Sequence, residues 1–248
     1  MYKIIKSNKL CKSKKVISFS LFTNENNDLR KKKYLDNDIY MLGAIVNIVE
    51  AQNIYPGWVC RFYVHTNVPI KEKLLERDDC EVIIIESNIP PMYWRFFVVD
   101  DPNIDLCIIR DTDSIVNIKE KNAVDEWINS NYILHTMHDH FHHARVIMGG
   151  MWGLKLKDKN INIVKKIYNY CDNKKFNWSY SDDQKFLRDY VFELYKNNVI
   201  DHNSNTLPKR LFEHSKCFPE STALKYGTFI GERIIDIPDI YKTNMHIN

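Results

Sequence analysis

The sequence predicts an α/β protein whose mainly parallel sheet is covered by helices on both faces and folds as a single domain. Short apolar runs rich in β-branched residues alternate along the chain with segments whose apolar residues recur at helical spacing. Strands of a parallel sheet are buried on both faces and therefore read as continuous apolar runs. A length of 248 residues suits one such domain, and no internal repeat or low-complexity linker divides it.

The individual elements follow from periodicity and from turn formers. Predicted strands cover residues 16–22, 61–66, 81–86, 106–109 and 132–137, and the run 146–153 follows a histidine-rich loop. Predicted helices cover residues 39–49, 70–76, 92–99, 117–129, 161–171 and 182–197. Asn117 with Glu120, and Ser181 with Gln184, have the spacing of a capping box. The lysine-rich stretch before residue 16 predicts a solvated, partly frayed N-terminus, or attraction to an anionic partner, and the last part of the chain predicts irregular structure.

Composition argues against several classes of function. A formal net charge of +3 is too small to indicate a nucleic-acid partner. None of the six cysteines forms a CxxC pair, and several lie in apolar runs, which favours buried thiols in a reducing compartment over a disulfide framework. No apolar stretch has the length of a membrane helix, and no signal core follows the basic N-terminus. We therefore expect a soluble, cytoplasmic protein.

Asp111 and Asp113 come directly after the apolar run 106–109. Ligands of open parallel sheets bind beyond the carboxyl ends of the strands, so chemistry is expected at this position. Two carboxylates at i and i+2 suit Mg²⁺ or Mn²⁺, which prefer oxygen ligands and leave positions for phosphate oxygens. The pair alone is a weak signal, because aspartate also favours turns and helix starts.

A series of short motifs carries a family resemblance. The motifs are NIYPGWVCRFYV at 53–64, YWRFF at 93–97, RDTDS at 110–114, AVDEW at 123–127, HDH at 138–140 and GGMWG at 149–153. In order and spacing, over residues 16–155, they resemble a group of bacterial and viral GT-A glycosyltransferases. The group is similar to a viral rhamnosyltransferase domain and, distantly, to the retaining galactosyl- and glucosyltransferases related to glycogenin. The sequence departs from the pattern at Ile115, where the family often has arginine, and at 137–141, where MHDHF replaces the usual MRDHP.

The resemblance implies a role for each matching position. The implied nucleotide- and donor-binding residues are Ser20, Leu21, Phe22, Arg95, Asp111, Thr112, Asp113, Gly149 and Gly150. The implied metal ligands are Asp111 and Asp113, with a C-terminal histidine, His202 or His214, as the third. The implied catalytic residues, beside the donor sugar, are Asp139, Asp183 and Gln184. Residues 16–155 would form the nucleotide-sugar-binding core, and residues 156–248 the acceptor-side and C-terminal helices and loops of the same domain.

Some of these residues also have a structural interpretation. Arg95 suits an ion pair, Gly149 and Gly150 suit a tight turn, and Asp183 suits the first turn of a helix. The histidines of 138–143 suggest zinc, but no cysteine or carboxylate partner at a convincing spacing supports it.

The function implied by the resemblance is a metal-dependent transfer of a sugar from a nucleotide-sugar to a glycan or other hydroxyl acceptor. UDP is the expected nucleotide by analogy, Mn²⁺ or Mg²⁺ the expected metal, and retention of configuration the expected outcome; if the enzyme inverts, Asp183 is a candidate base. Two alternatives stay open. Residues 107–116 partly resemble the nucleophile motif of haloacid-dehalogenase-type phosphatases. The domain could also be a catalytically degenerate module that binds nucleotide-sugars without turnover.

Overall fold

One mixed sheet of nine strands crosses the protein, which has the predicted α/β architecture. The computed structural model of the chain describes residues 2–8, 14–23, 37–156, 160–177, 179, 181–204, 212, 215–221, 224–225 and 227–234. The strands are β1 (Tyr2–Ser7), β2 (Lys15–Leu21), β3 (Val59–His65), β4 (Cys80–Ser87), β5 (Leu106–Arg110), β6 (Leu134–His138), β7 (Met151–Lys155), β8 (Val199–Asn203) and β9 (Ser215–Lys216). The helices are α1 (Asn37–Ile54), α2 (Lys71–Leu75), η2 (Pro91–Asp100), α3 (Ile118–Asn129), α4 (Ile163–Asn173), α5 (Asp182–Phe186), η3 (Leu187–Phe192) and α6 (Glu193–Tyr195).

The order of the strands brings many chain segments to a single edge of the sheet. That order is β1-β4-β3-β2-β5-β7-β6-β8-β9. Strands β4, β3, β2 and β5 are mutually parallel, and β6, β8 and β9 run in the same direction. Strand β7 is antiparallel to both β5 and β6, so it begins at the edge where these two strands end. Residues after β5, β6, β8 and β9 and residues before β7 therefore share one edge.

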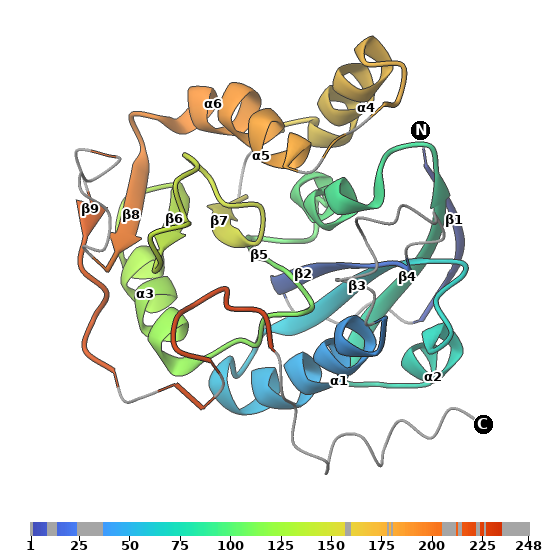
Figure 1. Ribbon diagram of the computed structural model, residues 1–248, viewed down its shortest axis with the longest axis horizontal. Helices are drawn as coiled ribbons and strands as arrows, with labels where there is room; N and C mark the ends of the chain where they lie inside the picture. The colour runs from blue at the N-terminus through green and yellow to red at the C-terminus, as the bar shows by residue number, and fades with distance from the viewer. Residues whose placement is uncertain are drawn as a thin grey trace.

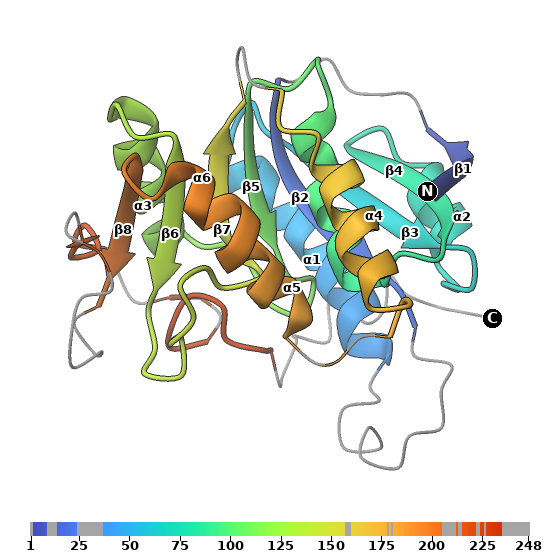
Figure 2. The same cartoon turned by 90° about the horizontal axis from the view of Figure 1, so that it is seen from above.

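Helices cover both faces of the sheet, as the continuous apolar strands predict. Figure 1 shows α4, α5 and α6 on one side and α1 and α3 on the other, and Figure 2 shows the same layers from above. Consecutive residues of β2 enter different cores. Val16 packs with η2, α4 and α5, whereas Ile17 packs with α1, α2 and α3. The alternation follows from the pleat of the strand and explains why both faces must be apolar.

Two parts of the chain differ from the prediction. The N-terminus was expected to be frayed, but β1 pairs antiparallel with β4 along residues 2–7. Its side chains are mostly exposed, so its sequence lacks the apolar pattern that would have identified an edge strand. The region after residue 198 was expected to be irregular, yet β8 and β9 extend the same sheet. Residues after 156 therefore contribute strands as well as helices and loops.

Three local features refine the predicted helices. The segment after Pro90 forms a 3₁₀ helix, η2, and the segment predicted as one helix over 182–197 includes a π-helical stretch, η3. Asn117 caps α3 as expected, since its side chain accepts a hydrogen bond from Glu120 N at 2.9 Å. The Glu120 side chain does not complete a capping box; it lies 3.2 Å from Arg110.

The described part of the chain contains no helix that is both long and apolar enough to cross a bilayer. Five of the six cysteines lie in that part, and none of the five forms a disulfide. Four of them are buried, as the apolar runs around them predict, and Cys217 is exposed.

Candidate active site

The Asp-x-Asp turn lies at the carboxyl end of β5, a buried strand between β2 and β7. Ser114 N donates to Asp111 O at 3.3 Å and closes the turn. The carboxylates differ in exposure, because the Asp111 side chain is 47% exposed and that of Asp113 only 17%. Thr112 lies between them with its side chain buried, and its carbonyl faces helix α1. The sequence prediction of a polar turn beyond a buried strand is confirmed.

Arg95 connects the Asp-x-Asp turn to helix α5, which comes later in the chain. One terminal guanidinium nitrogen pairs with Asp111, and the other donates to Asp183 Oδ2 at 2.8 Å. The backbone of Arg95 is fixed by strand β2, since Ser18 Oγ donates to its carbonyl at 2.7 Å and Ser20 Oγ accepts from its amide at 2.8 Å. Arg95 thus holds two acidic residues that lie 72 positions apart in the chain, 183 − 111.

The glycine pair before β7 leaves room for these side chains. A Cβ on Gly149 would lie 2.6 Å from Asp183 Oδ2 and 2.7 Å from Arg95 Nη2. A Cβ on Gly150 would lie 2.1 Å from Asp111 Oδ2. Any larger residue would therefore displace the ion pairs, so close approach requires the two glycines. The predicted site residues Arg95, Asp111, Gly149, Gly150 and Asp183 form one constellation.

Arg110, a residue the sequence did not single out, supports the turn from beneath. Its guanidinium is fully buried, donates to Gly150 O at 3.1 Å and to Ser114 Oγ at 2.9 Å, and lies 3.2 Å from Glu120 Oε2. Glu120 in turn accepts from Tyr55 Oη at 3.1 Å. A buried arginine is stable only when paired and hydrogen-bonded, and these partners supply both conditions. The position of Arg110 directly before Asp111 is the sequence signal that could have identified it as part of the site.

The C-terminal segment 227–234 contacts Asp113 at two points. The Asp113 carbonyl accepts from Ile234 N at 2.8 Å, and Arg233 Nε lies 3.6 Å from the Asp113 carboxylate. Burial, followed by the negative charge of Asp111, raises the pKa of the Asp113 carboxyl to about 6. A buried acid held close to a second acid gains most from a nearby cation.

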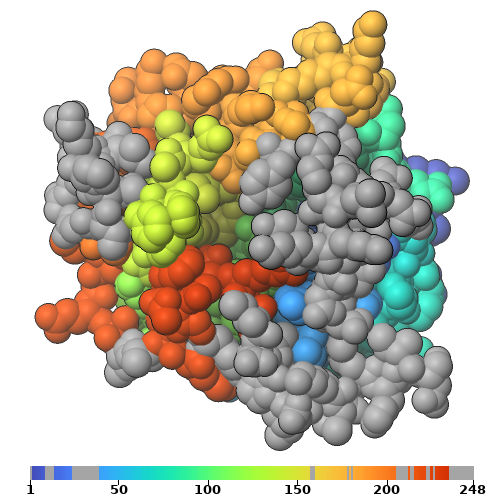
Figure 3. Space-filling view, viewed as in Figure 1, coloured from blue at the N-terminus to red at the C-terminus, as the bar shows by residue number. Residues whose placement is uncertain are grey.

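Asp139 follows β6 at the same edge of the sheet, but its carboxylate is enclosed by protein groups. Lys119 Nζ lies 2.6 Å from Oδ1 and 2.7 Å from Oδ2, and Ile230 N donates to Oδ2 at 2.8 Å. Figure 3 shows the C-terminal segment, in red, lying against the yellow-green segment around residue 140. The geometry therefore gives Asp139 a contact with Lys119 and the C-terminal segment, and its predicted contact with a donor sugar stays a prediction.

The segment Ser181–Gln184 does not form the capping box that its spacing suggested. Ser181 adopts a left-handed conformation with φ of 63° and makes no side-chain cap hydrogen bond. Asp182 takes the structural contacts instead, accepting from Ser179 N at 2.9 Å and Lys185 Nζ at 2.8 Å. Asp183 is left facing Arg95, and burial raises its carboxyl pKa against the opposing effect of that arginine. Gln184 is half-buried beside it.

His202 does not join the aspartates. It lies on β8, where its Nδ1 is 2.8 Å from His135 Nε2 and its Nε2 is 3.3 Å from Glu126 Oε2. Burial lowers the pKa of both histidines, which favours a neutral chain in which His135 donates to His202 and His202 to Glu126. Both ring nitrogens of His202 then have protein partners and neither faces a metal. His214, the other candidate, lies outside the described residues.

The three residues expected to face the nucleotide, Ser20, Leu21 and Phe22, have different surroundings. Ser20 binds the Arg95 amide, and Leu21 is buried in the core that faces α1. Phe22 follows β2 at the carboxyl edge of the sheet and is half-buried, so of the three it is the one placed to meet a ligand there.

A divalent cation of the magnesium or manganese kind fits the two aspartates. No three histidine, cysteine, aspartate or glutamate side chains are grouped as a metal cage anywhere in the described part of the chain, and this applies to the histidine-rich loop as well. Zinc in a structural site needs four such ligands, so the site does not fit zinc. Mg²⁺ and Mn²⁺ are commonly held by one or two carboxylates together with water and substrate phosphates. The half-exposed Asp111 and the buried Asp113 provide that donor set.

Comparison with known proteins found similarity to solved structures but to no family model or curated sequence. One similar structure is the galactosyltransferase LgtC in complex with donor and acceptor sugar analogues, with 15% identity, a TM-score of 0.46, and coverage of 77% of this chain and 73% of that one.

The second structure is 4-diphosphocytidyl-2C-methyl-D-erythritol synthase from Anaerococcus prevotii, with 9% identity, a TM-score of 0.44, and coverage of 94% of this chain and 98% of that one. The third is a protein provisionally assigned as a nucleotide-diphospho-sugar transferase from Desulfovibrio desulfuricans, with 12% identity, a TM-score of 0.42, and coverage of 77% and 80%. At these identities and scores, none of the three assigns an activity to this chain.

Proposed function

We propose that this protein is a metal-dependent glycosyltransferase that moves a sugar from a nucleoside-diphosphate sugar to a hydroxyl acceptor, with UDP as the nucleotide. One observation carries the proposal: Arg95 joins Asp111 of the Asp-x-Asp turn to Asp183, and Gly149 and Gly150 pack against all three. The constellation lies beyond the carboxyl ends of parallel strands, where open α/β sheets bind nucleotides. It combines two carboxylates for a cation with a guanidinium suited to phosphate.

Each residue has a distinct part in this proposal. Asp111 and Asp113 would hold Mg²⁺ or Mn²⁺, and the bound cation would offset negative charge on the departing diphosphate. Arg95 keeps the Asp111 carboxylate and the Asp183 carboxylate at fixed positions on either side of Gly149 and supplies a permanent positive charge beside them. The glycines leave room for the Arg95, Asp111 and Asp183 side chains to meet against the backbone before β7.

The contacts of the acidic residues favour retention of configuration. Asp183 is paired with Arg95, and Asp139 is enclosed by Lys119 and Ile230 N. Asp183 Oδ1 also accepts from Gln184 N at 2.9 Å, so protein groups occupy the oxygens of both carboxylates and neither is well placed to deprotonate an acceptor for attack from the opposite face. In the retaining route, the bond from the anomeric carbon to the diphosphate breaks, the acceptor oxygen bonds to that carbon on the same face, and the acceptor proton passes to the leaving phosphate oxygen.

The test is thermal unfolding of the full chain with UDP, GDP, dTDP or CMP, each with and without Mn²⁺. A nucleotide at a hundredfold its dissociation constant adds about 2.7 kcal/mol to the unfolding free energy. We expect one nucleotide to stabilise the protein only with the metal, and Asp113→Asn to remove that effect. Asp189→Asn is the matched control, because Asp189 is exposed on η3 and forms its ion pair with the neighbouring Arg188.

Other outcomes select the alternatives. Stabilisation by a nucleotide without any release of sugar from the corresponding nucleotide-sugars would indicate a binding module. No stabilisation by any nucleotide, together with hydrolysis of p-nitrophenyl phosphate that Asp111→Asn abolishes, would indicate a phosphatase with Asp111 as its nucleophile.

A further inference from the structure

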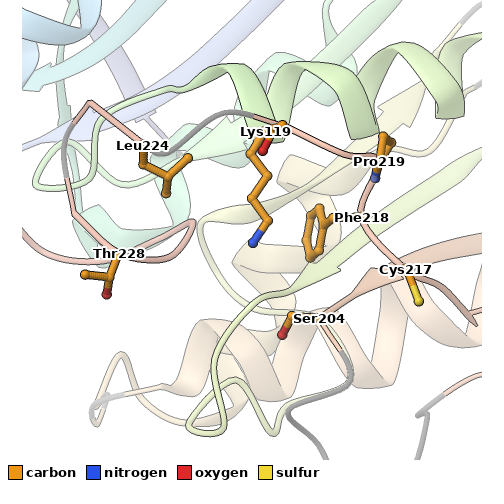
Figure 4. Close-up of a pocket in the computed structure, with 8 residues that line it drawn as sticks. Lys119, Ser204, Cys217, Phe218, Pro219, Leu224 and Thr228 are labelled. Atoms are coloured by element: carbon orange, nitrogen blue, oxygen red, sulfur yellow. The ribbon is translucent and has the colours of Figure 1, made fainter.

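A cavity lies between the start of α3 and the C-terminal part of the chain, among residues to which the transfer steps described above assign no role. It has a volume of about 430 Å³, within the range of small-molecule sites. Its walls are the first turn of α3 and the C-terminal part of the chain, and the lining residues used below are Lys119, Ser204, Cys217, Phe218, Leu224 and Thr228. Figure 4 shows Lys119 reaching from α3 into the space between the segment carrying Cys217 and Phe218 and the segment carrying Leu224 and Thr228.

The topology places this cavity on the functional edge of the sheet. Ser204 directly follows β8 and Phe218 lies two residues after β9, and both strands run parallel to β6. Asp139 directly follows β6, the neighbour of β8. Neighbouring strands are about 4.8 Å apart, so the cavity begins about one strand spacing from Asp139. Lys119 belongs to both places, because it lines the cavity and binds Asp139.

The charge of the cavity is balanced. Lys119 is the one charged side chain among the described residues that line the cavity, and both oxygens of Asp139 lie within 2.7 Å of the lysine ammonium. The ammonium also lies 4.8 Å from the centre of the Phe218 ring. With its charge offset by a carboxylate and directed over an aromatic face, Lys119 gives little preference for an anionic ligand. The cavity therefore favours a neutral molecule.

The remaining lining groups suit a polyhydroxylated ring. Phe218 and Leu224 present apolar surface, while Ser204 and Thr228 bring hydroxyl groups. A pyranose has the matching character, with C–H groups on its faces and hydroxyl groups around its rim. Lipids would need a longer apolar channel, and a phosphorylated molecule would need an uncompensated cation.

We propose that this cavity is the acceptor subsite and that it binds a neutral sugar unit. The inference rests on the proposed transferase function and narrows its acceptor to a carbohydrate. The C-terminal segment connects the two sites, because Ile230 N binds Asp139 and Ile234 N binds the Asp113 carbonyl. The four residues from Ile230 to Ile234 span at most about 14 Å, which limits the separation of Asp139, at the edge of the cavity, and the Asp-x-Asp turn.

The experiment measures binding of methyl glycosides to the full chain by saturation-transfer NMR. The probes are the methyl glycosides of glucose, galactose, mannose, rhamnose and glucuronic acid, tested with and without UDP and Mn²⁺. We expect at least one neutral glycoside to bind, and its dissociation constant to rise at least tenfold in Phe218→Ala. Leu224→Trp, which fills the cavity without removing a core contact, should have the same effect. Tyr190→Ala, an exposed aromatic on η3 outside the cavity, should leave binding unchanged.

Two results would overturn the proposal. One is the absence of binding by every neutral glycoside, or a clear preference for the glucuronide. The other is binding that Phe218→Ala and Leu224→Trp leave unchanged. Asp113→Asn separates this inference from the proposed function. If glycosides bind normally to Asp113→Asn while no nucleotide binds the native chain, the cavity is a carbohydrate site and the transferase assignment falls.

Discussion

Asn47 offers a sharp test of how the fold holds the Asp-x-Asp turn. It lies on α1, is fully buried, and its side chain reaches the backbone on both sides of the turn. Its Oδ1 accepts from Val116 N at 3.0 Å, and its Nδ2 lies 3.1 Å from Ser114 O and 3.4 Å from Thr112 O. The same nitrogen donates to Gly43 O at 2.9 Å within the helix.

The cost of Asn47→Ala follows from these contacts. The substitution leaves the buried amide of Val116 without its acceptor, which costs about 1–3 kcal/mol. Loss of the bonds to the turn carbonyls adds about 1 kcal/mol, and the better helix propensity of alanine returns about 0.5 kcal/mol. We expect the unfolding free energy to fall by about 3 kcal/mol in total. The turn should also lose its fixed position, so metal-dependent nucleotide affinity should fall at least tenfold.

Urea unfolding and nucleotide titration in the presence of Mn²⁺ measure the two effects. Asn53→Ala is the matched control, because Asn53 lies on the same helix and bonds the carbonyl of Val49 four residues earlier, but is exposed. Asn47→Asp separates size from hydrogen bonding, since it keeps the acceptor for Val116 N and replaces the donor that faces the carbonyls. Equal urea midpoints for Asn47→Ala and Asn53→Ala would show that the side chain does not anchor the turn.

Three further substitutions probe the constellation. The pKa of Asp113 is about 6 in the fold and about 3.9 in unfolded chains, so the folded protein binds the additional proton between these values. Stability without ligand should therefore fall as the pH rises from about 4 to 6, by up to about 3 kcal/mol, and Asp113→Asn should remove that slope in urea unfolding. Gly150→Ala should abolish nucleotide-dependent stabilisation, because the new Cβ would lie 2.1 Å from Asp111 Oδ2; a preserved thermal shift would contradict the close approach. Arg95→Met should lower the unfolding free energy at pH 7 by about 3–5 kcal/mol, and less at low pH, because it leaves the buried Asp183 unpaired; pH-independent loss would point to packing instead.

The sheet core could be predicted from the sequence because its strands have one physical requirement. Strands β2 to β5 are buried on both faces, so their sequences are mainly apolar and turn-forming or polar residues follow them. Strand β8 could not be recognised in that way. Its buried polar residue Asp201 is satisfied by partners distant in sequence, accepting from Thr136 Oγ1 at 2.9 Å and Ser215 Oγ at 2.8 Å. Nothing in the local sequence reveals such partners in advance.

The candidate site shows the same contrast between local patterns and contacts of residues distant in sequence. The Asp-x-Asp turn and the glycine pair were visible because each is a local pattern. The supporting contacts were not, because Asn47 binds Ser114 67 residues away, Arg110 binds Gly150 40 residues away and Lys119 binds Asp139 20 residues away. His202 illustrates the converse error. A histidine in the expected part of the chain suggested a ligand, whereas its two nitrogens are used by β6 and α3.

Every acidic side chain of the site has a cation from the chain itself. Asp111 and Asp183 share Arg95, Asp113 lies beside Arg233, and Asp139 binds Lys119.

Under the proposed function, a divalent cation that binds alone must compete with these side chains for the carboxylates. A metal that arrives with a diphosphate brings oxygens that can bind the displaced guanidinium groups, so both sets of charges stay paired. Metal and nucleotide should therefore strengthen each other's binding by the same factor, as linkage requires. The segment that carries Arg233 is also held at the site by the hydrogen bond from Ile234 N to the Asp113 carbonyl. Arg233 would therefore stay close to Asp113 when it exchanges the carboxylate for a phosphate oxygen.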